Sequence, residues 1–236
     1  MSWRRTQADL RRRTLKNFDS EGADGYDALV GSLSVEDEAA YLTDLSRVFS
    51  FQSGMRVLDA GAGTGALCKV LSRAEGLRIT ALEPAPAMID RFRAKSELSH
   101  VRVVEGFCDA IEDRAHFGAA QFDVIVSRQL VNGLYDPLTA FQNWHYWLAP
   151  GGAVVVVDGL YARSAWSGAW EEEIDVLPIS ACQTTALAPY LLERVGFEVE
   201  SVGPMSSANE LPSTRTFRYV VVGRKPQLES TLEDKR

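Results

Sequence analysis

The stretch Val57-Leu58-Asp59-Ala60-Gly61-Ala62-Gly63-Thr64-Gly65 joins an apolar strand to a helix that begins near Ala66. Its three glycines stand at alternate positions, where they let the backbone turn sharply and let a ligand lie against the main chain. Taken alone the stretch is ambiguous, because Gly61-x-Gly63-x-x-Ala66 also satisfies a dinucleotide-binding fingerprint. It predicts a ligand-binding loop after a buried strand, and the surrounding sequence decides which ligand.

Strand-like and helix-like segments alternate on both sides of this loop. Short apolar runs of strand length lie at 55–58, 78–82, 101–104, 122–126 and 153–157, with helical patterns at 64–74, 86–97 and 137–148. This alternation is typical of a doubly wound α/β fold, with helices on both faces of a mainly parallel sheet. A helix over 184–195 precedes strands at 197–202 and 216–222, which have no helix between them. We therefore expect a Rossmann-like sheet of seven strands whose last strand is antiparallel.

The chain of 236 residues has the length of one domain. We expect residues 1–50 to form a helical cover, with a helix over 4–16, a Gly/Asp-rich loop over 19–27 and a second helix from Ser34. Residues 51–224 would form the body, and the charged tail 225–236 is predicted to be disordered.

Composition excludes several classes of protein. Residues 1–16 hold six Lys or Arg and one Asp, so a net charge of −7 leaves −12 on the remainder, which disfavours binding to a phosphate backbone. Three cysteines without paired spacing favour neither a disulfide framework nor a zinc site, and we expect no metal and a reducing cytoplasm. The longest apolar run, 153–157, is too short to span a membrane, and no apolar stretch of a signal peptide follows the basic start.

Carboxylates follow the first three strands of the body. Asp59, two residues before the first glycine, can accept a hydrogen bond from a cationic amine, whereas a pyrophosphate there would be repelled. Glu83 ends the next strand, where a carboxylate can bind both hydroxyls of a ribose in either a nicotinamide or an adenosyl cofactor. Asp109 follows the third strand and can receive an adenine amino group.

With these features the chain resembles the class I S-adenosylmethionine-dependent methyltransferases over roughly residues 17–224. Residues 59–65 match the D/E-x-G-x-G-x-G motif, and Leu82-Glu83-Pro84 matches the ribose-binding acid. Cys108-Asp109-Ala110 is similar to the adenine-edge motif, and residues 144–152 are similar to the W-x-x-x-L-x-P-G-G turn before the fifth strand. The reversed last strand also favours this family over the nicotinamide oxidoreductases, which keep that strand parallel.

The resemblance implies S-adenosyl-L-methionine as the cofactor, bound across the carboxyl ends of the strands. It also implies an apolar residue covering the adenine, Met88, and an N-terminal cover that brings Phe18 and Tyr26 near the cofactor. The predicted cofactor-binding residues are Asp59, Gly61, Gly63, Gly65, Glu83, Met88, Asp109, Ala110, Ser127 and Tyr26.

Methyl transfer from a sulfonium is an in-line displacement that depends chiefly on alignment and desolvation. A hydroxyl acceptor with a high pKa also needs a base, but we expect no obligatory triad and assign no catalytic residue. The chain lacks the [DNS]-P-P-[YFW] clamp of nucleic-acid and protein-amide methyltransferases, and the sequence 127–137 resembles the small-molecule branch. We therefore expect an enzyme that methylates N or O of a small metabolite.

Residues after the fourth and fifth strands are the candidates for substrate binding. Arg128 can bind an acceptor carboxylate or the donor's methionine carboxylate, or form a structural ion pair. Trp166 and Trp170, four residues apart, would share one face of a helix. The predicted substrate-binding residues are Arg128, Gln129, Asn132, Tyr135, Tyr161 and Trp166.

Two alternatives stay open at this point. One is an RNA-modifying methyltransferase anchored by the basic residues 4–16, although the acidic body makes nucleic acid an unlikely partner. The other is a cofactor-binding protein without turnover that acts through a partner. The sequence predicts a small-molecule substrate and no membrane contact, and it does not predict an oligomeric state.

Overall fold

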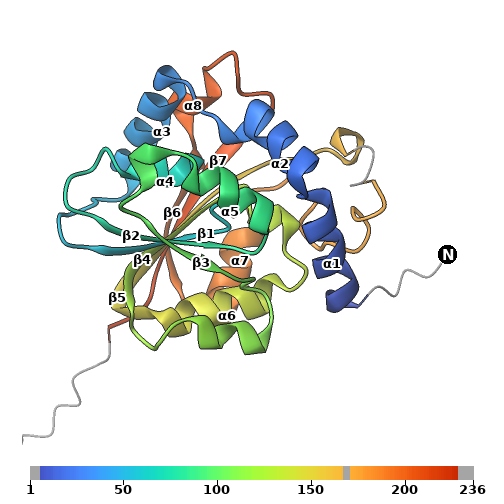
Figure 1. The fold of residues 1–236 in the computed structure, drawn as a ribbon. Helices are drawn as coiled ribbons and strands as arrows, with labels where there is room; N and C mark the ends of the chain where they lie inside the picture. Colours follow the sequence, from blue (N-terminus) through green and yellow to red (C-terminus); the bar gives the residue numbers. More distant parts are fainter. Residues whose placement is uncertain (1–5, 167–170, 228–236) are drawn as a thin grey trace, which may run out of the picture.

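The computed structural model describes residues 6–166 and 171–227. These residues form a seven-stranded sheet of order β3-β2-β1-β4-β5-β7-β6, in which β7 runs antiparallel to both of its neighbours (Figure 1). The predicted fold class is therefore confirmed. The strands are β1 (Arg56–Ala60), β2 (Arg78–Glu83), β3 (Arg102–Glu105), β4 (Phe122–Arg128), β5 (Leu148–Gly159), β6 (Glu198–Pro204) and β7 (Arg218–Arg224).

The order of the strands reverses beside β1. This strand lies between β2 and β4 and is parallel to both, so the chain leaves β1 and β4 towards opposite sides of the sheet. Ligands of open α/β sheets bind in the crevice at this reversal, outside the carboxyl ends of the strands. The glycine loop, which follows β1, lies at this place.

Helices cover both faces of the sheet, and each face has its own apolar core. Leu45 and Phe92 belong to a buried cluster on one face, and Trp144 and Trp147 belong to a cluster on the other. The first face carries α3, α4, α5 and α8, and the second carries α6 and α7 (Figure 1). Their bounds are α3 (Val35–Val48), α4 (Ala66–Leu71), α5 (Pro86–Arg93), α6 (Pro137–Trp147), α7 (Leu187–Arg194) and α8 (Ser206–Asn209).

The N-terminal cover is more helical than its sequence predicts. Helix α1 (Gln7–Asn17) was expected, but the predicted loop at 19–27 is wrong: α2 (Ser20–Tyr26) and a π-helical turn η1 (Asp27–Gly31) occupy it. Two contacts explain the difference. The Asp19 side chain caps α2 by accepting from the Gly22 amide at 3.1 Å, and Ala23 is fully buried against α5. Tertiary packing thus overrides the poor helix propensity of the glycines.

The segment after β5 also differs from the prediction. Trp166 has an extended backbone directly after the short 3-10 turn η5 (Arg163–Ala165), so its expected place on a helix is wrong. Trp170 lies outside the described residues, as does most of the predicted tail. Lys225 of that tail is packed, since its ammonium donates to the His145 and Leu148 carbonyls at 2.7 and 2.8 Å. None of the helices in the described part of the chain is long and apolar enough to cross a membrane.

Candidate functional site

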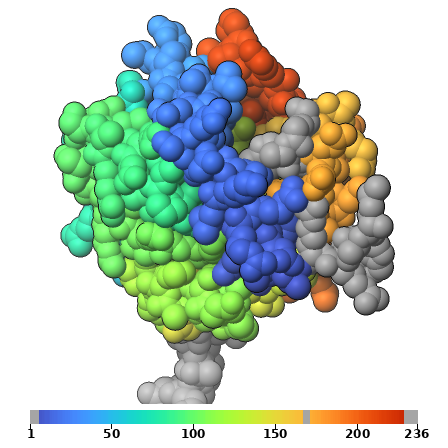
Figure 2. All heavy atoms as spheres, turned by 45° about the vertical axis from the view of Figure 1, so that its right-hand side comes forward, coloured from blue at the N-terminus to red at the C-terminus, as the bar shows by residue number. Residues whose placement is uncertain are grey.

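A cavity of about 600 Å³ opens at the carboxyl ends of β1, β2 and β4. Helices α1 and α2 cross this face of the molecule as a ridge, drawn in blue in Figure 2, and their side chains form part of the cavity wall. Twelve of the predicted site residues line this cavity: Tyr26, Gly61, Gly63, Glu83, Met88, Asp109, Arg128, Gln129, Asn132, Tyr135, Tyr161 and Trp166.

The three glycines of the loop all have positive φ, and the surroundings of Gly63 and Gly65 differ. A Cβ at Gly63, where φ is 56°, would meet nothing closer than the Tyr26 ring at 3.6 Å, so this position faces the cavity. A Cβ at Gly65 would lie 2.5 Å from Leu98 and 2.8 Å from Phe92, inside the core. Gly65 is thus required for packing, and the structure does not bring it to the cavity wall.

Glu83 ties the end of β2 to the glycine loop. Its two carboxylate oxygens accept from the backbone amides of Gly63 at 2.8 Å and Ala85 at 2.9 Å. Burial raises the pKa of this carboxyl to about 7, against the effect of these two amides. Each oxygen keeps a further lone pair, so the fixed carboxylate can accept a pair of adjacent hydroxyl groups.

Asp59 is buried at the end of β1, and one of its two carboxylate oxygens has no hydrogen-bond partner. Its Oδ2 accepts from the Cys68 thiol at 3.1 Å, and its Oδ1 has no partner. Burial raises the pKa of this carboxyl to about 7. An unpaired buried acceptor is costly, and a small recess of about 10 Å³, which Tyr26 and Arg128 also line, adjoins it. The site therefore fits a ligand that brings a cationic amine to Asp59.

Arg128 lies at the end of β4, between this recess and the main cavity. It is 7% exposed, its guanidinium donates to the Val30 carbonyl at 2.7 Å and to the Gln129 side chain, and it stacks over the Tyr41 ring at 5.6 Å. The structure pairs it with no carboxylate of the described residues, so the structural ion pair considered for it is not found. Asp59 lies near enough to interact with Arg128 electrostatically but forms no ion pair with it, so the guanidinium can still bind an anionic group of a ligand.

Three polar side chains converge beside Arg128, which donates to one of them, Gln129. The Gln129 amide and the Arg218 guanidinium both donate to the Tyr161 hydroxyl oxygen, the former at 3.0 Å. Gln129 has the left-handed φ of 56° that is uncommon outside glycine, and such strain tends to cluster at functional sites. Trp166 packs edge-on to Tyr161 at 6.0 Å. Sequence reasoning missed Arg218, because only the β5–β7 register brings it opposite Gly159.

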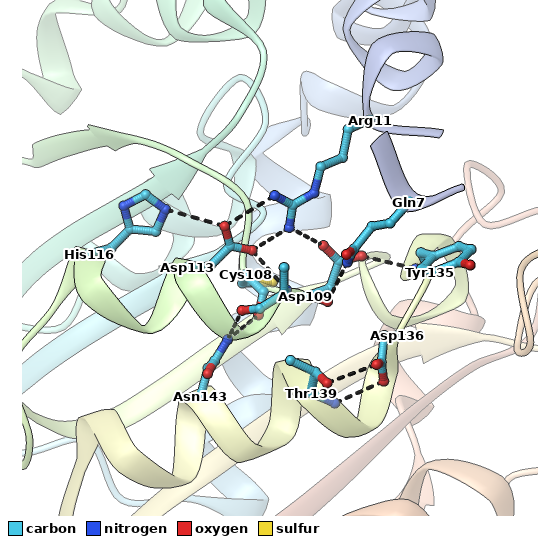
Figure 3. A network of polar contacts seen from close by, with 11 residues as sticks. Gln7, Arg11, Cys108, Asp109, Asp113, His116, Tyr135, Asp136, Thr139 and Asn143 are labelled. Atoms are coloured by element: carbon cyan, nitrogen blue, oxygen red, sulfur yellow. Dashed lines mark hydrogen bonds and ion pairs between the residues drawn. The ribbon is translucent and has the colours of Figure 1, made fainter. Parts of the chain in front are cut away.

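Asp109, predicted from the sequence to bind the adenine amino group, lines the cavity, as does Met88. Its Oδ2 accepts from the Tyr135 backbone amide at 3.0 Å, and its Oδ1 accepts from Arg11 of α1 at 2.8 Å (Figure 3). Gln7 of the same helix donates to the Asp109 carbonyl at 2.6 Å. No local sequence pattern predicted the contacts of Gln7 and Arg11, which join segments about one hundred residues apart.

Several residues that were predicted for the site do not line the cavity or already have a hydrogen-bond partner within the protein. Ala110 and Ser127 are buried away from the cavity wall, and the Ser127 hydroxyl has no partner. Asn132 reaches the wall, but its side chain donates to Asp158 at 2.9 Å, and burial raises the pKa of Asp158 to about 6. None of the three histidines is among the described residues that line the cavity.

Known proteins with similar sequences and structures can now be compared. A family model described as "Methyltransferase domain" matches residues 35–202. The ubiquinone biosynthesis O-methyltransferase of Xylella fastidiosa is 35% identical over 104 residues, which cover 44% of this chain and 42% of that protein. The match thus spans less than half the length of the curated relative.

Solved structures of low sequence identity share the fold. A SAM-dependent methyltransferase from Aquifex aeolicus superposes with a TM-score of 0.64 at 18% identity, covering 88% of this chain and 99% of that one. The [4+2]-cyclase SpnF superposes with a TM-score of 0.61 at 15% identity, covering 81% of each chain. Because the family model matches more than half of the sequence, the chain belongs to the methyltransferase-domain family, and its resemblance to the class I enzymes that use S-adenosyl-L-methionine is confirmed.

Proposed function

We propose that this protein transfers the methyl group of S-adenosyl-L-methionine to a hydroxyl oxygen of a small, largely apolar molecule. The observation that carries the proposal is a single cavity lined both by groups for the donor and by a converging polar cluster. The name of the Xylella fastidiosa relative supports oxygen as the methylated atom. The likeness to a cyclase means that the fold by itself does not decide the chemistry.

The donor would contact residues at the ends of four strands. We assign the Asp59 carboxylate to the methionine amino group and the Arg128 guanidinium to the methionine carboxylate, because both border the small recess. The Glu83 carboxylate would accept the two ribose hydroxyls, and Asp109 would accept the adenine amino group beside Met88. In this arrangement the acceptor would occupy the part of the cavity that Tyr161 lines.

The acceptor end of the cavity is mainly apolar. Trp166, which packs against Tyr161, and Leu177 contribute to the cavity wall, so a flat or hydrophobic molecule would be well packed there. The Tyr161 hydroxyl is the polar group fixed at this end, since two donors hold its oxygen. An acceptor hydroxyl that binds against Tyr161 would be oriented for in-line attack on the methyl carbon.

Replacing Tyr161 with phenylalanine tests this role. We expect Tyr161→Phe to lower kcat for a hydroxyl acceptor by roughly 100-fold, because the variant keeps the ring but loses the group that orients the reacting oxygen. The KM for S-adenosylmethionine should stay close to that of the unmodified protein. Tyr190 is an exposed tyrosine on α7, and Tyr190→Phe is the matched control. A raised KM for the acceptor with an unchanged kcat would argue against the assigned role.

The function itself is tested by product analysis. The purified protein is incubated with S-adenosylmethionine and a panel of phenols, catechols, aliphatic alcohols, hydroxy acids and amines, and mass spectrometry follows S-adenosylhomocysteine and methylated products. An O-methylated product formed together with S-adenosylhomocysteine supports the proposal. Binding of the cofactor without methylation of any compound would favour the alternative of a non-catalytic protein, and methylated amines would move the assignment to nitrogen.

The contacts of the N-terminal arginines argue against the RNA-modifying alternative. Arg11 and Arg13 of the basic start form ion pairs with carboxylates of the body, so these two charges are not displayed to a phosphate backbone. We expect titration with RNA at varied salt concentrations to show no specific binding. Tight and strongly salt-dependent binding would contradict this expectation.

A further inference from the structure

Helix α1 is held on the body mainly by polar contacts. Leu10 is the one buried residue within the helix. Arg13 donates to the Glu173 carboxylate at 3.0 Å, and Asn17 donates to the same carboxylate at 3.4 Å, which fixes the helix beside the acceptor end. Arg11 of the same helix reaches Asp109 (Figure 3). The helix is therefore tied to the body at Glu173 and at Asp109, both of which line the cavity.

Arg11 contacts two acidic side chains at once. Its Nη2 donates to Asp109 Oδ1 at 2.8 Å and also to Asp113 Oδ2, while its Nη1 donates to Asp113 Oδ1 at 3.2 Å. Both carboxylates are almost fully buried, with side chains 8% and 6% exposed. The planar guanidinium therefore links two buried carboxylates through charge-assisted hydrogen bonds.

The contact also fixes the orientation of Asp109. Arg11 takes one acceptor position on Oδ1, and the Tyr135 amide takes one on Oδ2. An ionised carboxylate offers about four such positions, so Asp109, which lines the cavity, can still accept a ligand amino group. The Arg11 guanidinium further packs over the Phe107 ring at 4.5 Å, which holds it at the cavity wall.

We propose that Arg11 is a positioning residue of the adenine subsite. It acts through Asp109: it orients this buried carboxylate to accept from the 6-amino group of adenine. Because Arg11 belongs to α1, the subsite is complete only while the helix is docked, and cofactor affinity depends on a residue nearly one hundred positions away from Asp109. The inference rests on the proposed function, which assigns Asp109 to the adenine amino group.

The neighbouring arginine provides a matched control. Arg12 stands on the same helix, but its side chain is 74% exposed and pairs with Asp9 of α1 itself. Arg11→Met and Arg12→Met therefore change the net charge equally, and they differ in whether the contact to Asp109 is lost. Arg11→Lys keeps the charge but loses the planar fork.

Isothermal titration calorimetry with two ligands tests the proposal. The ligands are S-adenosylhomocysteine and S-inosylhomocysteine, in which an oxo group replaces the 6-amino group. We expect Arg11→Met to weaken S-adenosylhomocysteine about tenfold or more and to reduce the preference for it over the inosyl ligand. Arg12→Met should leave both affinities within about twofold, since surface pairs contribute little. Arg11→Lys should recover part of the loss.

Each contrary result has its own meaning. Unchanged binding of S-adenosylhomocysteine by Arg11→Met overturns the inference, and so does an equal loss for both ligands, which would give Arg11 a general structural role. If Arg11→Met fails to fold by circular dichroism, Arg11→Met with Asp113→Asn is compared with Asp113→Asn alone, with the same expected loss of preference. If the unmodified protein binds neither ligand, the proposed function fails, and this inference fails with it.

Discussion

Gly63→Val should abolish the binding of S-adenosylhomocysteine in isothermal titration calorimetry. The branched side chain would enter the cavity at the point where the ligand approaches the backbone, since a Cβ there meets nothing nearer than Tyr26 at 3.6 Å. The positive φ of 56° adds strain that only glycine escapes. The loss of binding is the largest effect that we expect from a single substitution, because the variant blocks the ligand rather than removing one of its contacts.

Gly65→Ala is the comparison that separates binding from stability. Its Cβ would lie 2.5 Å from Leu98 in the core, so we expect a lower midpoint of thermal unfolding in this variant. Gly63→Ala, which adds a single methyl group, should fold. It should bind S-adenosylhomocysteine, but less tightly than the unmodified protein does. If folded Gly63→Val binds the ligand with unchanged affinity, the cofactor site is wrongly assigned.

The affinity for S-adenosylhomocysteine should rise steeply between pH 5 and pH 8. Burial raises the pKa of both Asp59 and Glu83 to about 7, whereas in the proposed arrangement the ligand's ammonium and hydroxyl groups would bind the ionised carboxylates. Binding must then displace protons, and each such carboxyl weakens binding about tenfold per pH unit below its pKa. Calorimetry in buffers of different ionisation enthalpy should detect the released protons. Affinity that is independent of pH would contradict these assignments.

The stability of the ligand-free protein should change in the opposite direction. Asp59, Glu83 and Asp158 have folded-state pKa values of about 7, 7 and 6, above those of the unfolded chain. The folded state therefore binds more protons than the unfolded state at pH values between about 4 and 7. Their contribution to stability is fully present at low pH and is lost as the pH rises through 6 to 7. The midpoint of thermal unfolding should therefore be higher at pH 5.5 than at pH 7.5. Glu83→Gln should reduce this difference between the two midpoints.

Local sequence patterns predicted the framework of the fold and of the donor site. The apolar runs and the three glycines predicted β1 and its loop because burial on both faces and the turn after the strand depend on neighbouring residues. Asp59 and Glu83 follow directly from the ends of β1 and β2. Each of these features depends on residues within a single strand-loop-helix unit, which is the range over which a sequence pattern is informative.

Contacts between distant segments could not be predicted in the same way. Arg11 lies in the predicted helix over 4–16, for whose basic residues the sequence suggested only an RNA anchor, and the docking of α1 shows that it meets Asp109. Arg218 contacts Tyr161 through an antiparallel pairing whose register the sequence does not specify. The segment 19–27 has the composition of a loop, and the burial of Ala23 against α5 makes it helical. In each case the packing of another part of the chain decides the structure.

The cavity wall has two origins, with consequences for how such a protein can change during evolution. The donor contacts assigned here come mostly from residues at the ends of β1 to β4, which the whole sheet holds in place. The acceptor end is built largely by the segment after β5, which contributes Tyr161, Trp166 and Leu177 to the cavity wall, and helix α1 is tied to this segment through Arg13 and Glu173. Mutations in these peripheral segments can alter the range of accepted molecules while the donor site persists. Diversification of substrates without loss of methyl-transfer chemistry is therefore open to this architecture.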